Sequence, residues 1–336
     1  MIAKPRNGFS LLETMVALAV LIGVSGIVMS GMVQMMKTQN TIGNRTEMHA
    51  SVRSATELLQ QEIGQAGKVS LGPPNVNVTM GAVGVGLNPI VFSTGVTVYP
   101  GEYLTVDLGD LQEVVAVSGS STSPSATFIR AHPSATTPVF ALGAFGTGVV
   151  PPDLNSIANG CAPATLPVPP GGAYPGTPFG STCNVLKLYG DINGDGNMVY
   201  IEYTCAPGTP TNPGFLYRNQ MNINAGGKPA LSPAMVLLNN VLPNPPDANN
   251  NTVPCFNYQV QKIGNTSVYC VTNVALTLTV QTQNVDAQTR QFQNETKALL
   301  NVGPRNVIEV WGTATLTDPT RAQPQPPTVT ALTQIP

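Results

Sequence analysis

One uncharged, apolar run near the N-terminus constrains the chain more than any other feature. Residues 9–36 read FSLLETMVALAVLIGVSGIVMSGMVQMM, and no charged residue lies between Met15 and Val33. A run of this length is sufficient for one membrane-spanning helix, which we place at about residues 14–36. Lys4 and Arg6 precede the run. Positive charges before a span keep the N-terminus in the cytoplasm, so the rest of the chain is expected outside it.

The run does not have the layout of an ordinary secretory signal. No A-x-A-like cleavage site follows Met36, whereas Gly8 and Phe9 stand immediately before the run. Glu13 lies inside the apolar segment, where a carboxylate is costly and needs a partner. One interpretation is a plain N-terminal anchor that tolerates an acid near the interface.

The string Gly8-Phe9-Ser10-Leu11-Leu12-Glu13 favours another interpretation. It resembles the cleavage and methylation motif of type IV prepilins and of type II secretion pseudopilins. The resemblance implies a leader peptide over residues 1–8, cleavage after Gly8 by prepilin peptidase, and N-methylation of Phe9. It also gives Glu13 a role in assembly, because its carboxylate can neutralise the terminal ammonium of a neighbouring subunit in a filament.

The helical pattern continues beyond the apolar run. Residues 37–66 carry a loose apolar stripe at helical spacing, formed by Ile42, Met48, Val52, Leu58, Leu59 and Ile63. A continuous helix over residues 9–66 would be roughly 87 Å long at 1.5 Å per residue. The sequence therefore predicts a helix whose first half spans the membrane and whose second half supports a head.

Residues 67–315 predict a β-rich, antiparallel head, which makes the fold class α+β and pilin-like. Strand-like runs separated by Gly, Ser and Asp turns occur at residues 89–99, 103–108, 113–119 and 126–131. Residues 101–142 are a candidate small β module, and the sequence leaves open whether the head is one sheet or two subdomains. His132 follows a strand-like run and is expected in a loop.

The clearest strand of the head lies late in the chain. Apolar residues alternate with polar ones over residues 274–283, which indicates one buried face. Residues 290–302 are expected to form its hairpin partner, and this pair resembles the closing strands of large PilW-class minor pilins and J-class pseudopilins. The proline-rich residues 316–336 lack periodicity and predict a flexible tail.

One segment of the head has the spacing of a calcium-binding loop. Residues 191–202 read DINGDGNMVYIE and match the pattern D-x-[DN]-x-[DN]-G-x5-E. A structural Ca²⁺ would take oxygen ligands from Asp191, Asn193, Asp195, Asn197 and Glu202. Strand-like flanks take the place of EF-hand helices, so a long β-hairpin turn is the alternative.

Five cysteines lie in the head, at Cys161, Cys183, Cys205, Cys255 and Cys270. In an oxidising compartment they predict disulfides, and an odd number leaves at least one without an intramolecular partner. The preferred pairing is Cys255–Cys270 and Cys161–Cys183, with Cys205 left over. A Cys183–Cys205 bridge around the candidate calcium loop is the rival.

Composition excludes several functional classes. Only 10% of the residues are charged and the formal net charge is −2, so specific nucleic-acid binding is not expected. Two histidines provide little material for histidine-based catalysis, and the sequence has neither a GxSxG motif nor a phosphate-binding loop, so an enzyme is not expected.

The resemblance implies a non-enzymatic structural subunit, a minor pilin at or near the tip of a type IV pilus. Its roles would be pilus priming, adhesion, motility or DNA uptake. It implies a single-pass protein of the bacterial inner membrane with its head in the periplasm, later exposed on a pilus. Partners would be other pilins or pseudopilins, prepilin peptidase and the inner-membrane assembly platform. A J-class type II secretion pseudopilin and a membrane-anchored adhesin outside any filament are the alternatives.

Overall fold

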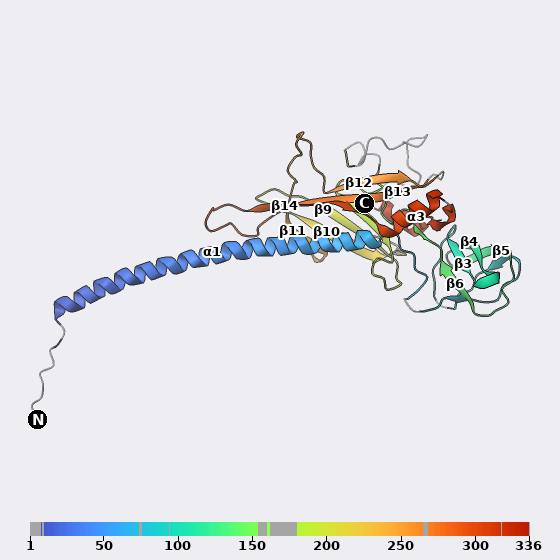
Figure 1. Cartoon of the computed structure of the whole chain (residues 1–336), viewed down its shortest axis with the longest axis horizontal. Coiled ribbons are helices and arrows are strands. Elements are labelled where there is room, and N and C mark those ends of the chain that lie inside the picture. The colour runs from blue at the N-terminus through green and yellow to red at the C-terminus, as the bar shows by residue number, and fades with distance from the viewer. Residues whose placement is uncertain are drawn as a thin grey trace, which may run out of the picture.

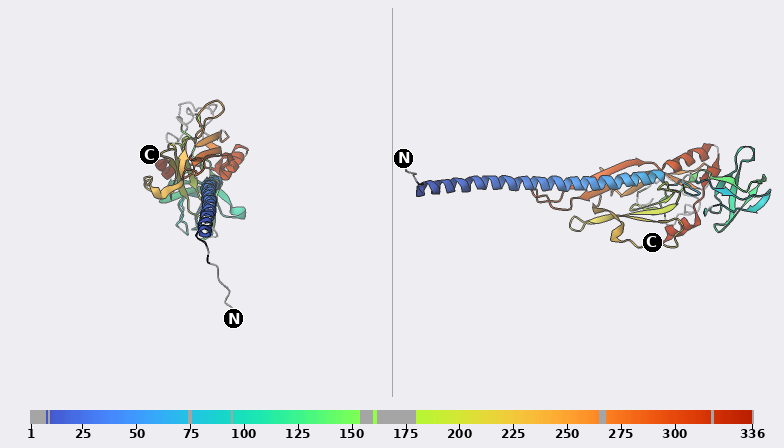
Figure 2. Two further views of the ribbon diagram at one scale, coloured as in Figure 1. Left: turned by 90° about the vertical axis from the view of Figure 1, so that its left-hand side faces the viewer. Right: turned by 90° about the horizontal axis from the view of Figure 1, so that it is seen from below.

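The computed structural model describes residues 8, 10–73, 76–93, 95–153, 160–161, 180–264, 268–316 and 318–335. A long helix leads into a head made mainly of antiparallel strands (Figure 1). The free part of this helix extends from one end of the molecule, and a small β-sheet lies at the opposite end (Figure 2). The expected layout, an apolar N-terminal helix followed by an antiparallel β-rich head, is therefore confirmed.

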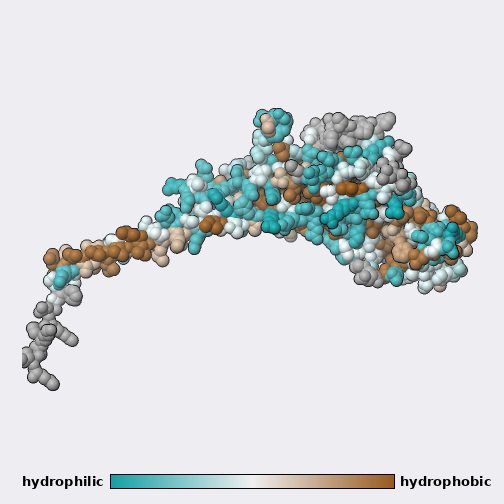
Figure 3. All heavy atoms as spheres, in the orientation of Figure 1, coloured by the Kyte–Doolittle hydropathy of each residue, from teal (hydrophilic) through white to brown (hydrophobic). Residues whose placement is uncertain are grey.

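Helix α1 (Leu11–Gln65) is continuous over 55 residues. It begins with a capping box, in which the Ser10 side chain accepts from the Glu13 N–H and the Glu13 carboxylate accepts from the Ser10 N–H. Its first half exposes its apolar side chains and buries none of its most apolar stretch. They appear as brown spheres on the face seen in Figure 3. Its second half packs against the head through Met48, Val52, Ala55, Thr56, Leu59, Glu62 and Ile63.

The main sheet of the head has seven antiparallel strands in the order β12-β13-β11-β10-β9-β8, with β14 also paired to β13. Its strands are β8 (Val185–Gly190), β9 (Val199–Ala206), β10 (Gly214–Asn222), β11 (Val236–Leu242), β12 (Phe256–Lys262), β13 (Tyr269–Gln281) and β14 (Asn294–Val302). The predicted hairpin of residues 274–283 and 290–302 corresponds to β13 and β14, which pair in antiparallel register.

The two faces of the main sheet have different covers. Alternate residues of β8 and β9 point to opposite sides. Leu188 and Ile201 belong to the cluster that packs on α1, whereas Tyr189 and Tyr200 belong to a second cluster. That second cluster contains residues of the C-terminal helix α4 (Pro327–Gln334). The sheet is thus enclosed between α1 and the end of the chain.

A second sheet of six strands forms the distal end of the head, in the order β1-β6-β3-β4-β5-β2. Its strands are β1 (Thr79–Met80), β2 (Gly86–Pro89), β3 (Tyr103–Val106), β4 (Glu113–Ser120), β5 (Ser123–Phe128) and β6 (Thr137–Ala141). It has its own apolar cluster, which includes Leu104, Val117 and Phe128. The predicted module over residues 101–142 is therefore too short, because β1 and β2 also belong to this sheet.

Helix α3 (Arg305–Leu316) and a short parallel pair, β7 (Ala144–Phe145) with β15 (Ala322–Gln323), connect the two sheets. Short 3-10 turns cover Gly109–Leu111 (η1), Pro233–Met235 (η2) and Pro319–Arg321 (η3). Asn306 of α3 donates from Nδ2 to the carbonyls of Gln65 and Ala66, at 3.1 and 3.3 Å, and so caps the C-terminal end of α1.

The prediction of a flexible tail over residues 316–336 is wrong for the part that the structure describes. Strand β15 pairs with β7, and helix α4 buries Val329 and Leu332 almost completely. Pro327 opens α4 at a position where proline is favoured in helices. Two apolar residues three positions apart are sufficient to fix one helical turn on the sheet, although they are too few to produce a clear periodicity.

Candidate functional site

The N-terminal motif lies at the exposed end of α1, away from the head. Gly8 and Ser10 are described and exposed, whereas residues 1–7 and Phe9 lie outside the described residues. The carboxylate of Glu13 accepts a 2.9 Å hydrogen bond from the Ser10 N–H, and among the described residues of the head it has no hydrogen-bond or ion-pair partner. Glu13 is therefore accessible to a partner that approaches the helix end.

The first half of α1 is the one helix in the described chain that is long and apolar enough to cross a membrane. No residue of its most apolar window is buried within the protein. The exposed large side chains include Leu18, Leu21, Ile22, Ile27 and Met29. In water this surface would be strongly unfavourable, so it requires a lipid or protein cover.

A buried ion pair fixes the second half of α1 to the main sheet. The Glu62 side chain is 5% exposed, and its Oε1 lies 2.5 Å from the Arg218 guanidinium of β10. The hydroxyl of Tyr203 on β9 donates to Glu62 Oε2 at 2.5 Å. Burial, followed by the negative charge of Glu62, raises the pKa of Tyr203 far above its ordinary value. The phenol therefore remains a hydrogen-bond donor.

The turn between β8 and β9 holds four of the five residues predicted to bind calcium. Asp191 is almost fully buried, its Oδ2 lies 2.9 Å from Lys68 Nζ, and its Oδ1 accepts from the Gly196 N–H at 3.2 Å. Asp195 Oδ1 accepts from the Asn197 N–H at 2.9 Å. One carboxylate oxygen of Asp191 is thus paired with an ammonium group and the other with a backbone N–H.

The structure does not bring the fifth predicted ligand, Glu202, into this turn. Glu202 lies within β9, where its carboxylate is 3.0 Å from Lys228 Nζ and accepts from the Tyr200 hydroxyl at 3.0 Å. Among the described residues no group of three or more His, Cys, Asp or Glu side chains is placed to hold a metal. The backbone between β8 and β9 forms a hairpin turn, which is the alternative interpretation. A calcium ion at Asp191 would have to displace Lys68.

Two disulfides cross-link the head. Cys161 is bonded to Cys183, as predicted, but the second bridge joins Cys205 to Cys255 and leaves Cys270 as a buried free thiol. The prediction of a Cys255–Cys270 bridge is wrong, and so is its rival Cys183–Cys205. Burial raises the pKa of the Cys270 thiol to about 12, which keeps it protonated and unreactive.

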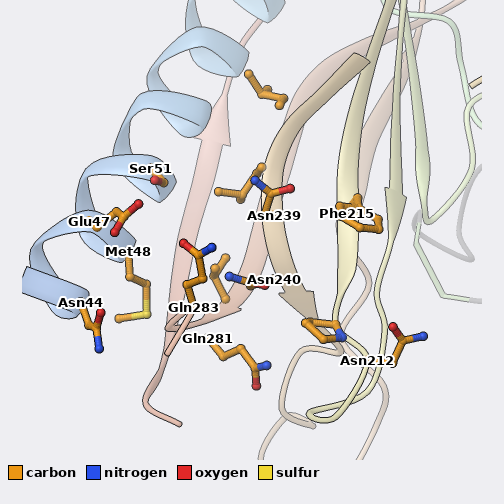
Figure 4. A pocket seen from close by; sticks show the side chains of 14 residues that line it. Asn44, Glu47, Met48, Ser51, Asn212, Phe215, Asn239, Asn240, Gln281 and Gln283 are labelled. Atoms are coloured by element: carbon orange, nitrogen blue, oxygen red, sulfur yellow. The ribbon is translucent and has the colours of Figure 1, made fainter. Parts of the chain in front are cut away.

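A hollow of about 470 Å³ opens between α1 and the strands β10, β11 and β13. It lies where β11 leaves β13, because these strands pair only at Val241 and Leu242 and the preceding Asn240 has a left-handed φ of 59°. Figure 4 shows amide side chains gathered around it, and Glu47 is the one ionisable side chain of its described lining. Such a lining suits neutral polar groups better than charged ones.

His132 lies between β5 and β6, outside the named strands as expected, but it is not at the surface. Its ring is fully buried in the distal sheet, with Nδ1 2.9 Å from Asp107 Oδ2 and Nε2 2.8 Å from Glu113 Oε1. The hydrogen bond from His132 lowers the pKa of Asp107. This bridge joins the end of β3 to the start of β4, and no spacing in the sequence indicates it.

Glu102 is a second buried acid of the distal region. Its Oε2 accepts a 2.9 Å hydrogen bond from the Tyr99 N–H, whereas its Oε1 has no hydrogen-bond partner among the described residues. Burial raises the pKa of Glu102 to about 7. The carboxyl group is therefore partly protonated near neutral pH.

The outer face of the distal sheet exposes apolar side chains. Val114, Thr105 and Phe140 form one cross-strand row on adjacent strands, and Val114 and Phe140 are 47% and 45% exposed. Further exposed apolar residues of this region are Val85, Leu87, Val91, Leu108 and Ile129. Figure 3 shows this brown surface at the end of the molecule opposite the N-terminus.

Comparisons with known proteins identify no relative of this chain, so a functional conclusion rests on its sequence and structure. No model of a known protein family, no curated protein and no solved structure matches this chain.

Proposed function

We propose that the chain is a structural subunit of a type IV pilus or a related filament, and that it acts as a minor pilin at or near the filament tip. The observation that carries the proposal is α1, whose first half is apolar on all sides and unburied while its second half forms part of the head core. A helix of this kind has a surface that only lipid or neighbouring helices can cover.

Glu13 supports the same proposal through its position. Cleavage after Gly8 would create a terminal ammonium at Phe9, four residues before Glu13 in the chain. In a bundle of such helices, the Glu13 carboxylate of one subunit neutralises the ammonium of the next, so that two costly charges become one pair. The pairing also fixes the axial register of adjacent subunits.

The shape of the head favours a tip position over a repeated one. The distal sheet extends beyond the C-terminal end of α1, on the side opposite the membrane half (Figure 1). Such an extension is difficult to repeat densely along a fibre, whereas a tip places no neighbour above it. We propose the bacterial inner membrane as the site of insertion, with prepilin peptidase, the assembly platform and other pilins as partners.

Mass spectrometry of the N-terminal peptide tests the proposal. In cells that contain prepilin peptidase we expect a chain that starts at N-methylated Phe9, and in a peptidase-null strain one that starts at Met1. A chain that starts at Met1 in both strains would contradict the proposal and favour a permanently anchored adhesin.

A second measurement tests assembly itself. Glu13→Leu removes the carboxylate and keeps an apolar helix, so we expect normal membrane insertion but loss from sheared filament fractions. Glu57→Leu, on an exposed part of the same helix, serves as the control. Equal recovery of wild type and Glu13→Leu in filaments would refute the assembly role. If the wild-type protein is recovered with type II secretion filaments instead of pili, the chain is a type II secretion pseudopilin.

A further inference from the structure

Three polar side chains form a buried row across the main sheet. Lys187 of β8, Glu202 of β9 and Asn219 of β10 are paired opposite one another, so their side chains lie on the same face. They are only 7%, 8% and 2% exposed. This face is the one that packs against the C-terminal helix α4.

A second lysine enters this row from the loop that follows β10. Lys228 Nζ lies 3.0 Å from Glu202 Oε2 and 3.3 Å from Oε1, and its side chain is 7% exposed. The Asn219 amide donates from Nδ2 to the carbonyl of Pro229 at 2.8 Å, which holds it beside the residue that follows Lys228. Lys228 Nζ also donates to the Ile335 carbonyl at 2.5 Å. Glu202, which contacts the Lys228 amine and is paired opposite Asn219, therefore lies beside both a buried amine and a buried carboxamide.

Two features of this cluster are not explained by an ion pair alone. Asn219 Oδ1 is buried and has no hydrogen-bond partner among the described residues, an arrangement that costs about 1–3 kcal/mol. In addition, Lys228 and Lys187 both lie near Glu202, and the positive charge of Lys228 acts on Lys187. A reaction that converts one of these amines into a neutral amide would relieve the crowding of positive charge around Glu202.

We propose that Lys228 and Asn219 form an intramolecular isopeptide bond, with Glu202 as the proton carrier. Glu202 takes a proton from the Lys228 ammonium, and the neutral amine attacks Cγ of Asn219. A bond forms between Lys228 Nζ and Asn219 Cγ, and the bond from Cγ to Nδ2 breaks. Glu202 passes this proton, and then the second proton that Nζ loses after the attack, to the leaving nitrogen, which departs as an ammonium ion.

The step balances without an oxidant or any co-reactant. An ammonium and a carboxamide become a secondary amide and an ammonium ion, so charge and electrons are conserved. The fold keeps Lys228 and Asn219 beside the same buried carboxylate, which lowers the entropic cost of a reaction between them. After the reaction Glu202 keeps the Tyr200 hydroxyl at 3.0 Å as its hydrogen-bond donor.

Peptide mass spectrometry of the full chain, extracted in detergent, tests the proposal directly. Trypsin cleaves after Arg218 and Lys262 but not between Lys228 and Pro229, so both reacting residues lie in the peptide 219–262. After disulfide reduction we expect this peptide to lack the mass of one ammonia molecule. Backbone breaks between residues 219 and 228 should not separate the two pieces. A peptide with its full mass would overturn the proposal.

Three variants identify the reacting groups. Lys228→Arg keeps the positive charge but removes the nucleophile, and Glu202→Gln removes the proton carrier, so both should restore the full peptide mass. Lys187→Arg should leave the ammonia loss in place, because Lys187 lies across β9 from Asn219. Loss of the modification in Lys187→Arg together with its persistence in Lys228→Arg would refute the assignment. Formation of the Cys205–Cys255 bridge checks that each variant folds.

Discussion

The buried network of Glu62 allows a quantitative test of how α1 is held to the head. Glu62→Ala removes the acceptor of the Tyr203 hydroxyl and the counter-ion of Arg218 at once. Removal of one partner of a buried ion pair costs about 3–5 kcal/mol. The Arg218 side chain is 22% exposed, so water partly replaces the lost contact. We therefore expect a loss near the lower end, about 3 kcal/mol.

The variant Glu62→Gln separates charge from hydrogen bonding. Its amide oxygen still accepts one hydrogen bond, but the charge that faces Arg218 is gone. We expect about half the loss of Glu62→Ala, because a neutral hydrogen bond contributes about 1 kcal/mol and a charged one about twice that.

Denaturant unfolding of the full chain in detergent measures these losses. The single tryptophan, Trp311, lies on α3 and donates to the Lys262 carbonyl at 3.1 Å, so its fluorescence reports on the head and not on the exposed first half of α1. The control is Glu57→Ala on the same helix. Glu57 pairs with Arg53 at the surface, and exposed pairs contribute little.

The loss of stability in Glu62→Ala is compared with that in the control Glu57→Ala. If Glu62→Ala destabilises the head no more than Glu57→Ala does, the inference that this buried network fixes the helix is refuted. If Glu62→Gln is as damaging as Glu62→Ala, the charge, and not the hydrogen bonds, is the important element.

Three further predictions concern the head. The pKa of Glu102 is about 7 in the fold against an ordinary 4.5, so the folded state binds the extra proton between these values. Stability should therefore fall as pH rises from about 4.5 to 7, by about 3 kcal/mol in all, and Glu102→Gln should abolish this slope in pH-dependent unfolding. Cys205→Ser opens a loop of 50 residues and should cost about 4 kcal/mol, whereas Cys270→Ser should leave both disulfides intact in a peptide map. Lys68→Met should strengthen calcium binding in calorimetric titration, because Lys68 competes for Asp191, and equal heats in both proteins would contradict this.

The elements that sequence predicts best are those with long, regular patterns. Helix α1 has an uninterrupted apolar run followed by an apolar stripe, and both features depend on local chemistry alone. The β13–β14 hairpin has a clean alternation over residues 274–283. By contrast, β1 and β2 contain two and four residues, and their pairing depends on β6 and β5, which are distant in the sequence.

Helix α3 could have been found from its spacing. Val307, Val310, Trp311 and Ala314 recur at helical intervals after Pro304. The Cys205–Cys255 bridge could not, because it depends on how β9 meets the start of β12. The burial of His132 likewise depends on two acids brought together by the turn between β3 and β4.

The way α1 joins the head has a mechanical consequence. The exposed apolar half of α1 continues directly into the half that packs on the main sheet, so a pull on the head from the N-terminal side enters along the helix axis (Figure 2). Met48, Val52, Leu59 and Ile63 are buried at successive levels along that axis. The load is then shared by all these levels in shear, whereas a peeling force would break them one after another. Because resistance to force is governed by the unfolding rate, the core that folds this head also sets how much tension the joint between α1 and the head withstands.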